Sequence, residues 1–282
     1  MNYCGNILII GRSNVGKSTL INKIVGSKIS ITSKKPQTTY LNITGINTEN
    51  KYQAIYTDTP GVYFYKNKII NFFNKDFYKN LLLSSKEEYV LVILVVEVNI
   101  WTNIEEKMFN SLKEINIKIL IVINKIDILY KKNELLPYIK KISNKKNFIS
   151  ILPISAKNNI NIDKLKSIVF NILPKKKHIF LKKNFIGNFT NKFFISEIIR
   201  ENLINSLYKE LPYNFYIEIE KLYEKNFIYV YANIIVNKIN YKKIIIGKNG
   251  NKIKTIRKSS QKYLEKKFLK KFFLYIWVKI KI

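Results

Sequence analysis

Short apolar runs and amphipathic segments alternate along the first 174 residues of the chain. Residues 6–10 (NILII) are almost entirely apolar and predict a strand, and residues 18–26 (STLINKIVG) predict a helix. The apolar side of this helix would be formed by Leu20, Ile21, Ile24 and Val25. Three more predicted strands end within residues 53–61, 117–127 and 148–157. This order predicts an α/β domain with a doubly wound, mostly parallel sheet.

The pattern changes after Pro174, where a helical segment gives way to a basic stretch with little periodicity. Residues 193–212 then predict a helix, with apolar side chains at Ile195, Ile198, Ile199, Leu203 and Leu207. Two β-rich runs, expected to be antiparallel, a short helix, a glycine loop, a longer helix and a final alternating strand follow. We therefore predict an N-terminal domain (1–174), a basic linker (175–192) and an α+β domain (193–282).

A phosphate-binding pattern lies between the first predicted strand and helix, in the segment GRSNVGKST (residues 11–19). It matches G-x-x-x-x-G-K-S, in which backbone N–H groups surround the phosphates of a nucleotide. Lys17 would reach the β- and γ-phosphate oxygens, and the Ser18 hydroxyl would bind Mg²⁺. The residues predicted to bind the nucleotide and its metal here are Gly11, Asn14, Val15, Gly16, Lys17, Ser18 and Thr19.

A second motif, DTPG, follows at the carboxyl end of another predicted strand. Asp58 would hold Mg²⁺ through water, and the Gly61 N–H would approach the γ-phosphate. An isolated D-x-x-G is more often an ordinary turn. The motif gains weight because ligands bind at the carboxyl ends of strands in open α/β sheets, where all of these motifs fall.

Two more motifs point to a guanine base. In NKID, formed by Asn124, Lys125 and Asp127, the carboxylate would accept hydrogen bonds from the guanine N1–H and 2-amino groups, which adenine does not offer. In ISAK, the guanine O6 would be approached by backbone N–H groups of Ser155, Ala156 and Lys157. Together the motifs predict a site for GTP and GDP rather than for ATP.

Composition changes the picture mainly through charge. The chain has 282 residues and a formal net charge of +31, which favours a polyanionic partner, either nucleic acid or an anionic membrane surface. Abundant Lys, Asn and Ile with scarce Gly would also follow from AT-rich coding, so charge alone leaves both interpretations open. The C-terminal part, from Lys175 to Ile282, holds 25 basic and seven acidic residues, against 25 and 12 in residues 1–174. Uniform coding bias does not predict that asymmetry.

The counts of cysteine and histidine exclude several classes of site. Cys4 is the only cysteine and His178 the only histidine, which excludes disulfides, Cys/His zinc sites and His-based triads. No secretory signal is evident, and Glu97 interrupts the longest strongly apolar run, which is too short for a bilayer. We expect a cytoplasmic protein, with peripheral contact on the inner face of the cell membrane as the alternative.

The glycine loop near the C-terminus, GKNG, differs in spacing from the first loop and precedes a basic helix. Two glycines and a helix N-terminus let a nucleic-acid backbone approach closely, and lysines add positive charge. By itself, such a loop is more often a helix-capping turn. The residues predicted to contact RNA are Gly247, Lys248, Asn249, Gly250, Lys252, Lys254 and Arg257.

These motifs in this order resemble the Era family of translation-factor-like GTPases, over nearly the whole chain. The resemblance implies a P-loop GTPase domain followed by a type II KH domain, whose G-x-x-G loop clamps about four nucleotides. It also implies that SKKPQTTYLNITGI is switch I. Thr39, or as second choice Thr38, would complete the Mg²⁺ ligands beside Ser18 and Asp58. The catalytic residues would be Lys17, Thr39, Gly61 and Asn14.

Two positions bear on the mechanism that the resemblance implies. Asn14 matches an asparagine that helps hold K⁺ beside the phosphates in related GTPases, but it could equally stabilise the loop. Val62 stands where Ras-like enzymes have a water-orienting glutamine, so hydrolysis should be slow without a partner.

The family implies a monomeric switch that binds the 3′ end of small-subunit (16S) rRNA and assists assembly of the small ribosomal subunit. Two alternatives stay open. One is an RNA chaperone whose GTPase activity has weakened or been lost, and the other is a membrane-surface GTPase. Intact Lys17, Ser18, Asp58 and Asp127 argue against the first.

Overall fold

The computed structural model describes residues 1–30, 43–58, 64–65, 68–69, 89–115, 117–180, 191–207 and 215–281. Compact packing divides the chain into two units, whose described parts lie within residues 1–180 and 191–281. Strands and helices alternate along the chain, as the hydrophobic pattern of apolar runs and amphipathic segments predicts.

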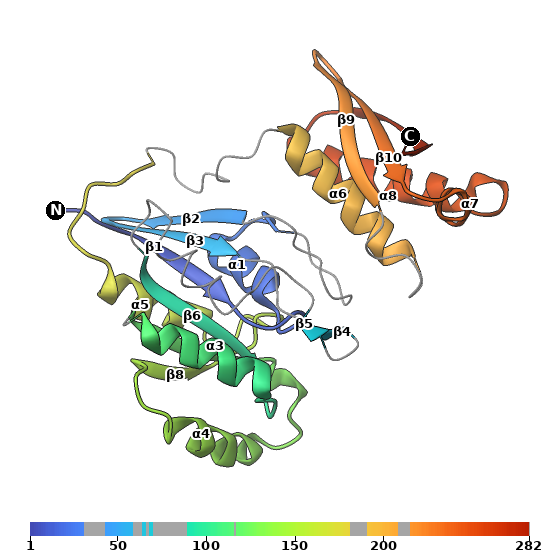
Figure 1. Ribbon diagram of the computed structural model, residues 1–282. Helices are drawn as coiled ribbons and strands as arrows, with labels where there is room; N and C mark the ends of the chain where they lie inside the picture. The colour runs from blue at the N-terminus through green and yellow to red at the C-terminus, as the bar shows by residue number, and fades with distance from the viewer. Residues whose placement is uncertain are drawn as a thin grey trace. The chain divides into compact units, whose positions relative to one another are not determined.

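The first unit contains a six-stranded sheet in the order β2-β3-β1-β6-β7-β8 (Figure 1). Only β2 runs antiparallel to its neighbour, so the sheet is mostly parallel, as predicted. Its strands are β1 (Tyr3–Ile10), β2 (Ile43–Glu49), β3 (Tyr52–Asp58), β6 (Tyr89–Glu97), β7 (Ile119–Asn124) and β8 (Ser150–Pro153). A separate two-stranded pair is formed by β4 (Phe64–Tyr65) and β5 (Lys68–Ile69).

Helices cover both faces of this sheet. They are α1 (Lys17–Val25), α3 (Asn103–Glu114), α4 (Leu135–Ser143) and α5 (Ile162–Ile172), with short 3₁₀ turns η1 (Ile126–Ile128) and η2 (Lys132–Glu134). α3 and α4 pack on one face, and α1 and α5 contact the sheet and each other. All four apolar residues of NILII are fully buried, because β1 is central and both of its faces are covered.

Residues 175–180, the first part of the predicted linker, lie along the edge of the first unit. Tyr3 pairs with Lys175, and the Lys176 N–H donates to the Asn2 carbonyl at 3.1 Å. The buried Gln53 side chain accepts from the Ile179 N–H at 2.8 Å and donates to the Phe180 carbonyl at 2.8 Å. This part of the segment is therefore held by β1 and β3, a contact that the sequence pattern did not indicate.

The second unit contains a three-stranded sheet in the order β11-β10-β9, with β9 antiparallel and β11 parallel to β10. Its elements are α6 (Asn191–Ser206), β9 (Phe215–Glu224), β10 (Ile228–Val236), α7 (Ile239–Ile246), the 3₁₀ turn η3 (Lys248–Gly250), α8 (Asn251–Phe268) and β11 (Phe272–Ile280). This order and the antiparallel pair confirm the predicted α+β arrangement. α6 begins two residues before the predicted start of its helix.

The core of the second unit lies between one face of this sheet and the helices. Alternate residues of β10, from Ile228 to Val236, face α6, α7 and α8. On α8, Ile256 and Leu264 are buried as predicted, whereas Ile253 is only half-buried. The lysines between them are mostly exposed, as an amphipathic helix requires.

Candidate functional site

The phosphate-binding segment joins β1 to α1 through backbone that needs its two glycines. Gly11 and Gly16 have φ values of +154° and +99°. A Cβ atom on Gly11 would lie 2.3 Å from the Val95 carbonyl oxygen, and one on Gly16 would lie 2.3 Å from Asn124 Nδ2. Close approach and positive φ together explain why the pattern requires glycine at these two positions.

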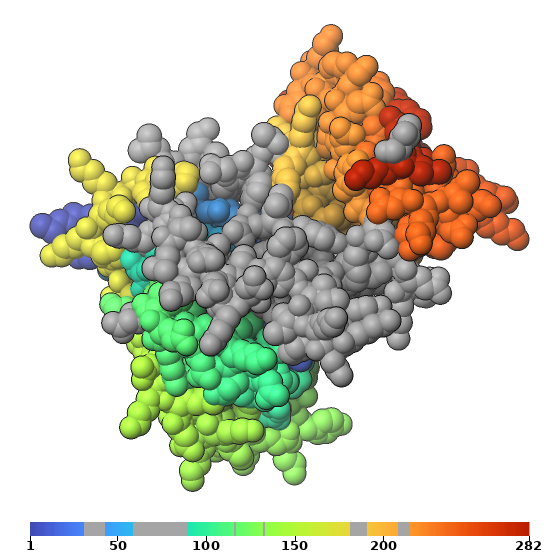
Figure 2. All heavy atoms as spheres, in the orientation of Figure 1, coloured from blue at the N-terminus to red at the C-terminus, as the bar shows by residue number. Residues whose placement is uncertain are grey.

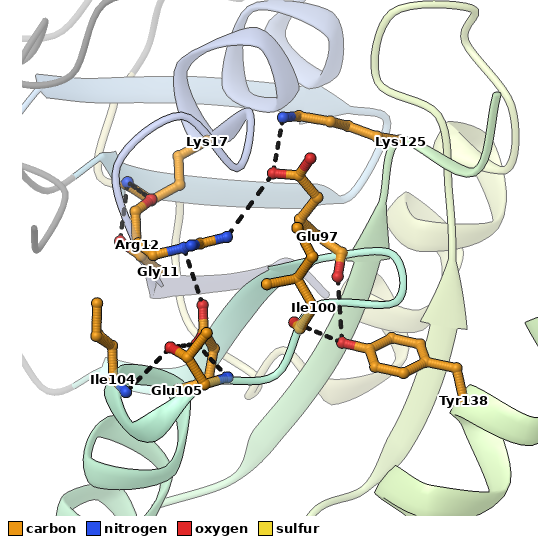
Figure 3. Close-up of polar contacts among 10 residues, drawn as sticks. Gly11, Arg12, Lys17, Glu97, Ile100, Ile104, Glu105, Lys125 and Tyr138 are labelled. Carbon is orange, nitrogen blue, oxygen red and sulfur yellow. Dashed lines mark hydrogen bonds and ion pairs between the residues drawn. The ribbon is translucent and has the colours of Figure 1, made fainter. Parts of the chain in front are cut away.

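Lys17 begins α1 and turns back over the loop. Its side chain is buried, and Nζ donates to the carbonyl oxygens of Gly11 and Arg12 at 3.0 Å each (Figure 3). Burial lowers the pKa of the Lys17 ammonium to about 8, against the opposing influence of the Asp58 charge. Phosphate oxygens at this position would stabilise the charged form, because they supply the negative charge that the buried ammonium lacks.

A hydroxyl and a carboxylate meet beside Lys17. Ser18 Oγ donates to Asp58 Oδ2 at 2.8 Å, and Ser30 Oγ donates to the same oxygen at 3.0 Å. Burial raises the pKa of the Asp58 carboxyl, although Lys17 and both hydroxyls oppose the shift. Asp58 Oδ1 is buried without a hydrogen-bond partner among the described residues. The pair therefore fits Mg²⁺, a hard cation bound through oxygen ligands.

Among the described residues no three His, Cys, Asp or Glu side chains form a metal cluster. A magnesium ion bound with a nucleotide does not require one, because the phosphates and waters supply most of its ligands.

Asn124 connects three of the predicted motifs. Its Nδ2 donates to the Val15 carbonyl at 2.8 Å, and its Oδ1 accepts from the Ala156 N–H at 3.0 Å. Ser155 Oγ donates to Asp127 Oδ1 at 2.5 Å, which orients the carboxylate predicted to recognise guanine. The carboxyl ends of β1, β7 and β8 are thereby fixed together.

The backbone N–H groups of the ISAK motif are not equally available to hydrogen-bond a guanine base. The Ser155 N–H donates to the Ile160 carbonyl, and the Ala156 N–H is bonded to Asn124. Among the described residues, only the Lys157 N–H of the three has no partner.

Arg12, in the first loop, belongs to an ion-pair network that the sequence motifs did not indicate (Figure 3). Arg12 Nε lies 3.2 Å from Glu105 Oε1, and Arg12 Nη2 lies 3.9 Å from Glu97 Oε2. Glu97 also pairs with Lys125 Nζ at 2.8 Å. Glu105 is fully buried and caps α3 by accepting from the Thr102 N–H at 2.8 Å. The network links the phosphate loop to the NKID motif.

Replacing Gly16 with alanine should lower the free energy of unfolding by about 2–4 kcal/mol, because left-handed strain adds to the clash with Asn124. Urea unfolding measures the loss. Gly26→Ala is the matched control: Gly26 also has positive φ, +71°, but a Cβ there meets nothing within 4 Å. The control should lose about 1 kcal/mol. Equal losses would show that Asn124 moves aside freely.

Replacing Arg12 with alanine should destabilise the protein by about 3 kcal/mol, because Glu105 would remain buried without its cation. Adding Glu105→Gln should recover part of this loss, since an amide carries no charge. Lys166→Ala, which removes a pair with the half-exposed Glu49, should change stability by less than about 1 kcal/mol. Urea unfolding of the three variants tests this, and no recovery in the double variant would contradict the electrostatic explanation.

Three predicted nucleotide-site residues, Thr38, Thr39 and Gly61, lie outside the described residues. Asn14 lies in the loop with a positive φ of 64°. Thr19 occupies the first turn of α1, and the Lys157 side chain is exposed.

The second glycine loop joins α7 to α8 at the surface of the second unit (Figures 1 and 2). Gly247, Asn249 and Gly250 all have positive φ values, of 73°, 53° and 71°. A Cβ on Gly247 would lie 2.7 Å from the Lys252 Cβ, so glycine is required for this turn. Lys248 and Asn249 are exposed, as a backbone-clamping loop needs.

A groove of about 380 Å³ lies between residues 257–265 of α8 and residues 273–275 of β11. Arg257, Lys258 and Lys262 line its helical side, and Leu274 and Tyr275 line its strand side. Of the predicted RNA contacts, Arg257 lies in this groove. Lys254 is exposed and Lys252 is half-buried on α8.

Comparison with known proteins identifies both units. Residues 6–125 match a family model described as 50S ribosome-binding GTPase, and residues 210–282 match the KH domain family. The GTPase Era of Buchnera aphidicola from Acyrthosiphon pisum (strain APS) is 46% identical over 281 residues, covering 99% of this chain and 98% of that protein. The chain belongs to the Era family of GTPases. The Era GTPase of Yersinia enterocolitica is 42% identical, over 99% of this chain and 91% of its own length.

Solved Era structures share the fold. An Aquifex aeolicus Era variant bound to GDP and AlF4⁻ has a TM-score of 0.89 and 30% identity, covering 99% of this chain and 94% of that one. Era in complex with MgGDPNP and nucleotides 1506–1542 of 16S ribosomal RNA also has a TM-score of 0.89, with 31% identity over 100% of this chain and 94% of that one. The P-loop GTPase and KH domain assignments are therefore confirmed, and the protein is a GTPase. No helix in the described ranges is long and apolar enough to cross a membrane.

Proposed function

We propose that this protein is a GTP-hydrolysing switch that binds the 3′ end of small-subunit rRNA and assists assembly of the small ribosomal subunit. The observation that carries the proposal is the presence, in one chain, of a constrained nucleotide site and of a glycine loop at the start of α8, a basic helix that also lines a groove. The Era complex with nucleotides 1506–1542 of 16S rRNA supports the choice of target.

In this proposal the first unit binds GTP with its described motifs. Lys17 would move from the loop carbonyls to the β- and γ-phosphates, and Asp127 would hold the guanine N1–H and 2-amino groups. The Lys157 N–H would donate to the guanine O6, because the Ser155 and Ala156 N–H groups already have partners.

Magnesium would be held by Ser18 and Thr39 directly and by Asp58 through water, with the orphaned Asp58 Oδ1 as the free acceptor. When bound, the ion would neutralise charge that develops on the phosphates. Gly61 would donate its N–H to the γ-phosphate, and Asn14 would help hold K⁺. Because Val62 offers no polar side chain to orient water, hydrolysis would be slow without a partner.

The proposed boundaries are 1–174 for the GTPase domain, 175–192 for the linker and 193–282 for the KH domain. RNA would lie on Gly247–Gly250 and along Lys252, Lys254 and Arg257. The protein would act as a cytoplasmic monomer. GTP would favour RNA-bound arrangements of the domains, and hydrolysis would favour release.

The test compares binding of a small-subunit rRNA 3′ fragment with that of a scrambled RNA of equal length, in GTP and in GDP, across a salt series. The slope of log affinity against log salt should be about −0.7 per phosphate contact. A preference for the true sequence that persists at high salt supports the proposal. Equal binding of both RNAs at every salt concentration would refute the rRNA target, and RNA binding without GTP turnover would favour the chaperone alternative.

A further inference from the structure

The sheet of the second unit has an outer face that none of the described helices covers. α6, α7 and α8 pack on the inner face. The outer face carries aromatic side chains on all three strands: Tyr216, Tyr223, Tyr229, Tyr231, Phe273, Tyr275 and Trp277. Trp277 is 47% exposed, and Tyr223 is 51% exposed.

Three of these rings stand nearly parallel. The Tyr231 ring lies 5.0 Å from that of Tyr275, at 17°, and 6.0 Å from that of Trp277, at 7°. Tyr223 meets Tyr231 edge-on, at 84°. Cross-strand aromatic packing stabilises sheets, but half-exposed rings also offer π-faces on which nucleobases stack.

A hollow of about 390 Å³ lies among these rings, within the range of about 300–1,000 Å³ typical of ligand pockets. Tyr223 and Trp277 line it together with Lys221 and Lys279, whose ammonium groups suit phosphate. Rings interleaved with lysines are the composition of single-strand nucleic-acid surfaces.

Asn233 contributes an unsatisfied polar group to the same hollow. It is 3% exposed, and its Nδ2 donates to Glu220 Oε2 at 2.8 Å. Its Oδ1 has no hydrogen-bond partner among the described residues. An unpaired buried acceptor is unfavourable, so a base N–H that bonded to it would gain stability. Glu220 is the acidic member of the lining and is engaged by both Asn233 and Lys279.

The outer face is continuous with the groove beside α8. Tyr275 stands on the edge strand β11, lines that groove, and stacks on Tyr231 of the outer face. An RNA strand that leaves the groove can therefore pass over β11 without crossing a second helix or β-strand. Lys271 lies 5.6 Å from the Phe273 ring centre and adds charge along the same edge.

We propose that this outer face, centred on Tyr223, Tyr231 and Trp277, is a second RNA-binding surface on which unpaired bases stack after leaving the α8–β11 groove. The inference rests on the proposed RNA binding but assigns it a separate surface. Its ligand is single-stranded RNA longer than the four or so nucleotides that a G-x-x-G loop clamps.

The first test measures affinity for a four-nucleotide RNA and for one of about ten nucleotides, using the full-length protein. Tyr223→Ala and Trp277→Ala should each weaken binding of the longer RNA about tenfold and leave the shorter one unchanged. Tyr216→Ala is the matched control, since Tyr216 is equally exposed, at 49%, on the same face but does not line the hollow. Circular dichroism verifies that each variant folds.

A second readout uses only a conservative substitution, Trp277→Phe. The chain has two tryptophans, Trp101 and Trp277, so the fluorescence difference between the protein and its Trp277→Phe variant reports Trp277 alone. The longer RNA should quench that difference and the shorter RNA should not. Unchanged affinity in both alanine variants without quenching would overturn the second surface and leave the proposed function standing. Failure of the unmodified protein to bind either RNA would overturn both.

Discussion

Replacing Asp127 with asparagine is expected to convert the protein from a guanosine to a xanthosine nucleotide binder. Guanine presents two N–H donors to the carboxylate, whereas asparagine offers one acceptor and one donor, so the 2-amino group would face an NH₂ group. Losing one charged hydrogen bond and leaving a donor unpaired should weaken GTP binding about 100- to 1,000-fold. Xanthine has a carbonyl at the same position and would accept from the asparagine amide.

The measurement is a pair of titrations with GDP and xanthosine diphosphate. The Asp127→Asn variant should prefer xanthosine diphosphate, and the unmodified protein should prefer GDP. Asp163→Asn is the control, because its side chain is 89% exposed at the start of α5 and should leave both affinities unchanged. If Asp127→Asn bound GDP normally, Asp127 would not be the base-recognising group, and its bond from Ser155 would be structural only.

Replacing Lys17 with alanine should reduce GTP turnover at saturating nucleotide about 100- to 1,000-fold, as for the loss of one preorganised group that stabilises transition-state charge. The loss follows from position: in the described structure Lys17 Nζ lies over the loop that surrounds the phosphates, and no other described ammonium bonds to those loop carbonyls. Phosphate release under single-turnover conditions separates this effect from weaker binding.

Lys23→Ala is the matched control, since Lys23 lies in the last turn of the same helix with its side chain exposed. Its turnover should equal that of the unmodified protein. Thermal unfolding of both variants checks folding, and removal of the buried Lys17 ammonium should not destabilise the nucleotide-free protein strongly, because burial already disfavours its charge. Turnover by Lys17→Ala within about threefold of normal would assign phosphate stabilisation to other groups.

The sequence determined the order of elements and the identity of the motif residues. Each depends on neighbours within a few positions: the apolar run before Gly11, the spacing of Gly16 and Lys17, and the alternation in β9 and β10. Because ligands bind at the strand ends of open α/β sheets, motif order alone also brought Asp58, Asn124 and Ser155 to one edge.

Only the tertiary structure decided how those motifs hold one another. Asn124 spans Val15 and Ala156, and Arg12 reaches Glu105 on α3, through contacts between residues that are far apart in the chain. Local pattern does not encode such pairs, since they depend on strand register and on which helix covers which face. The sequence likewise showed β-rich runs but not that their aromatic residues share one open face. That arrangement exists only once β9, β10 and β11 pair in register, with the helices on the other side.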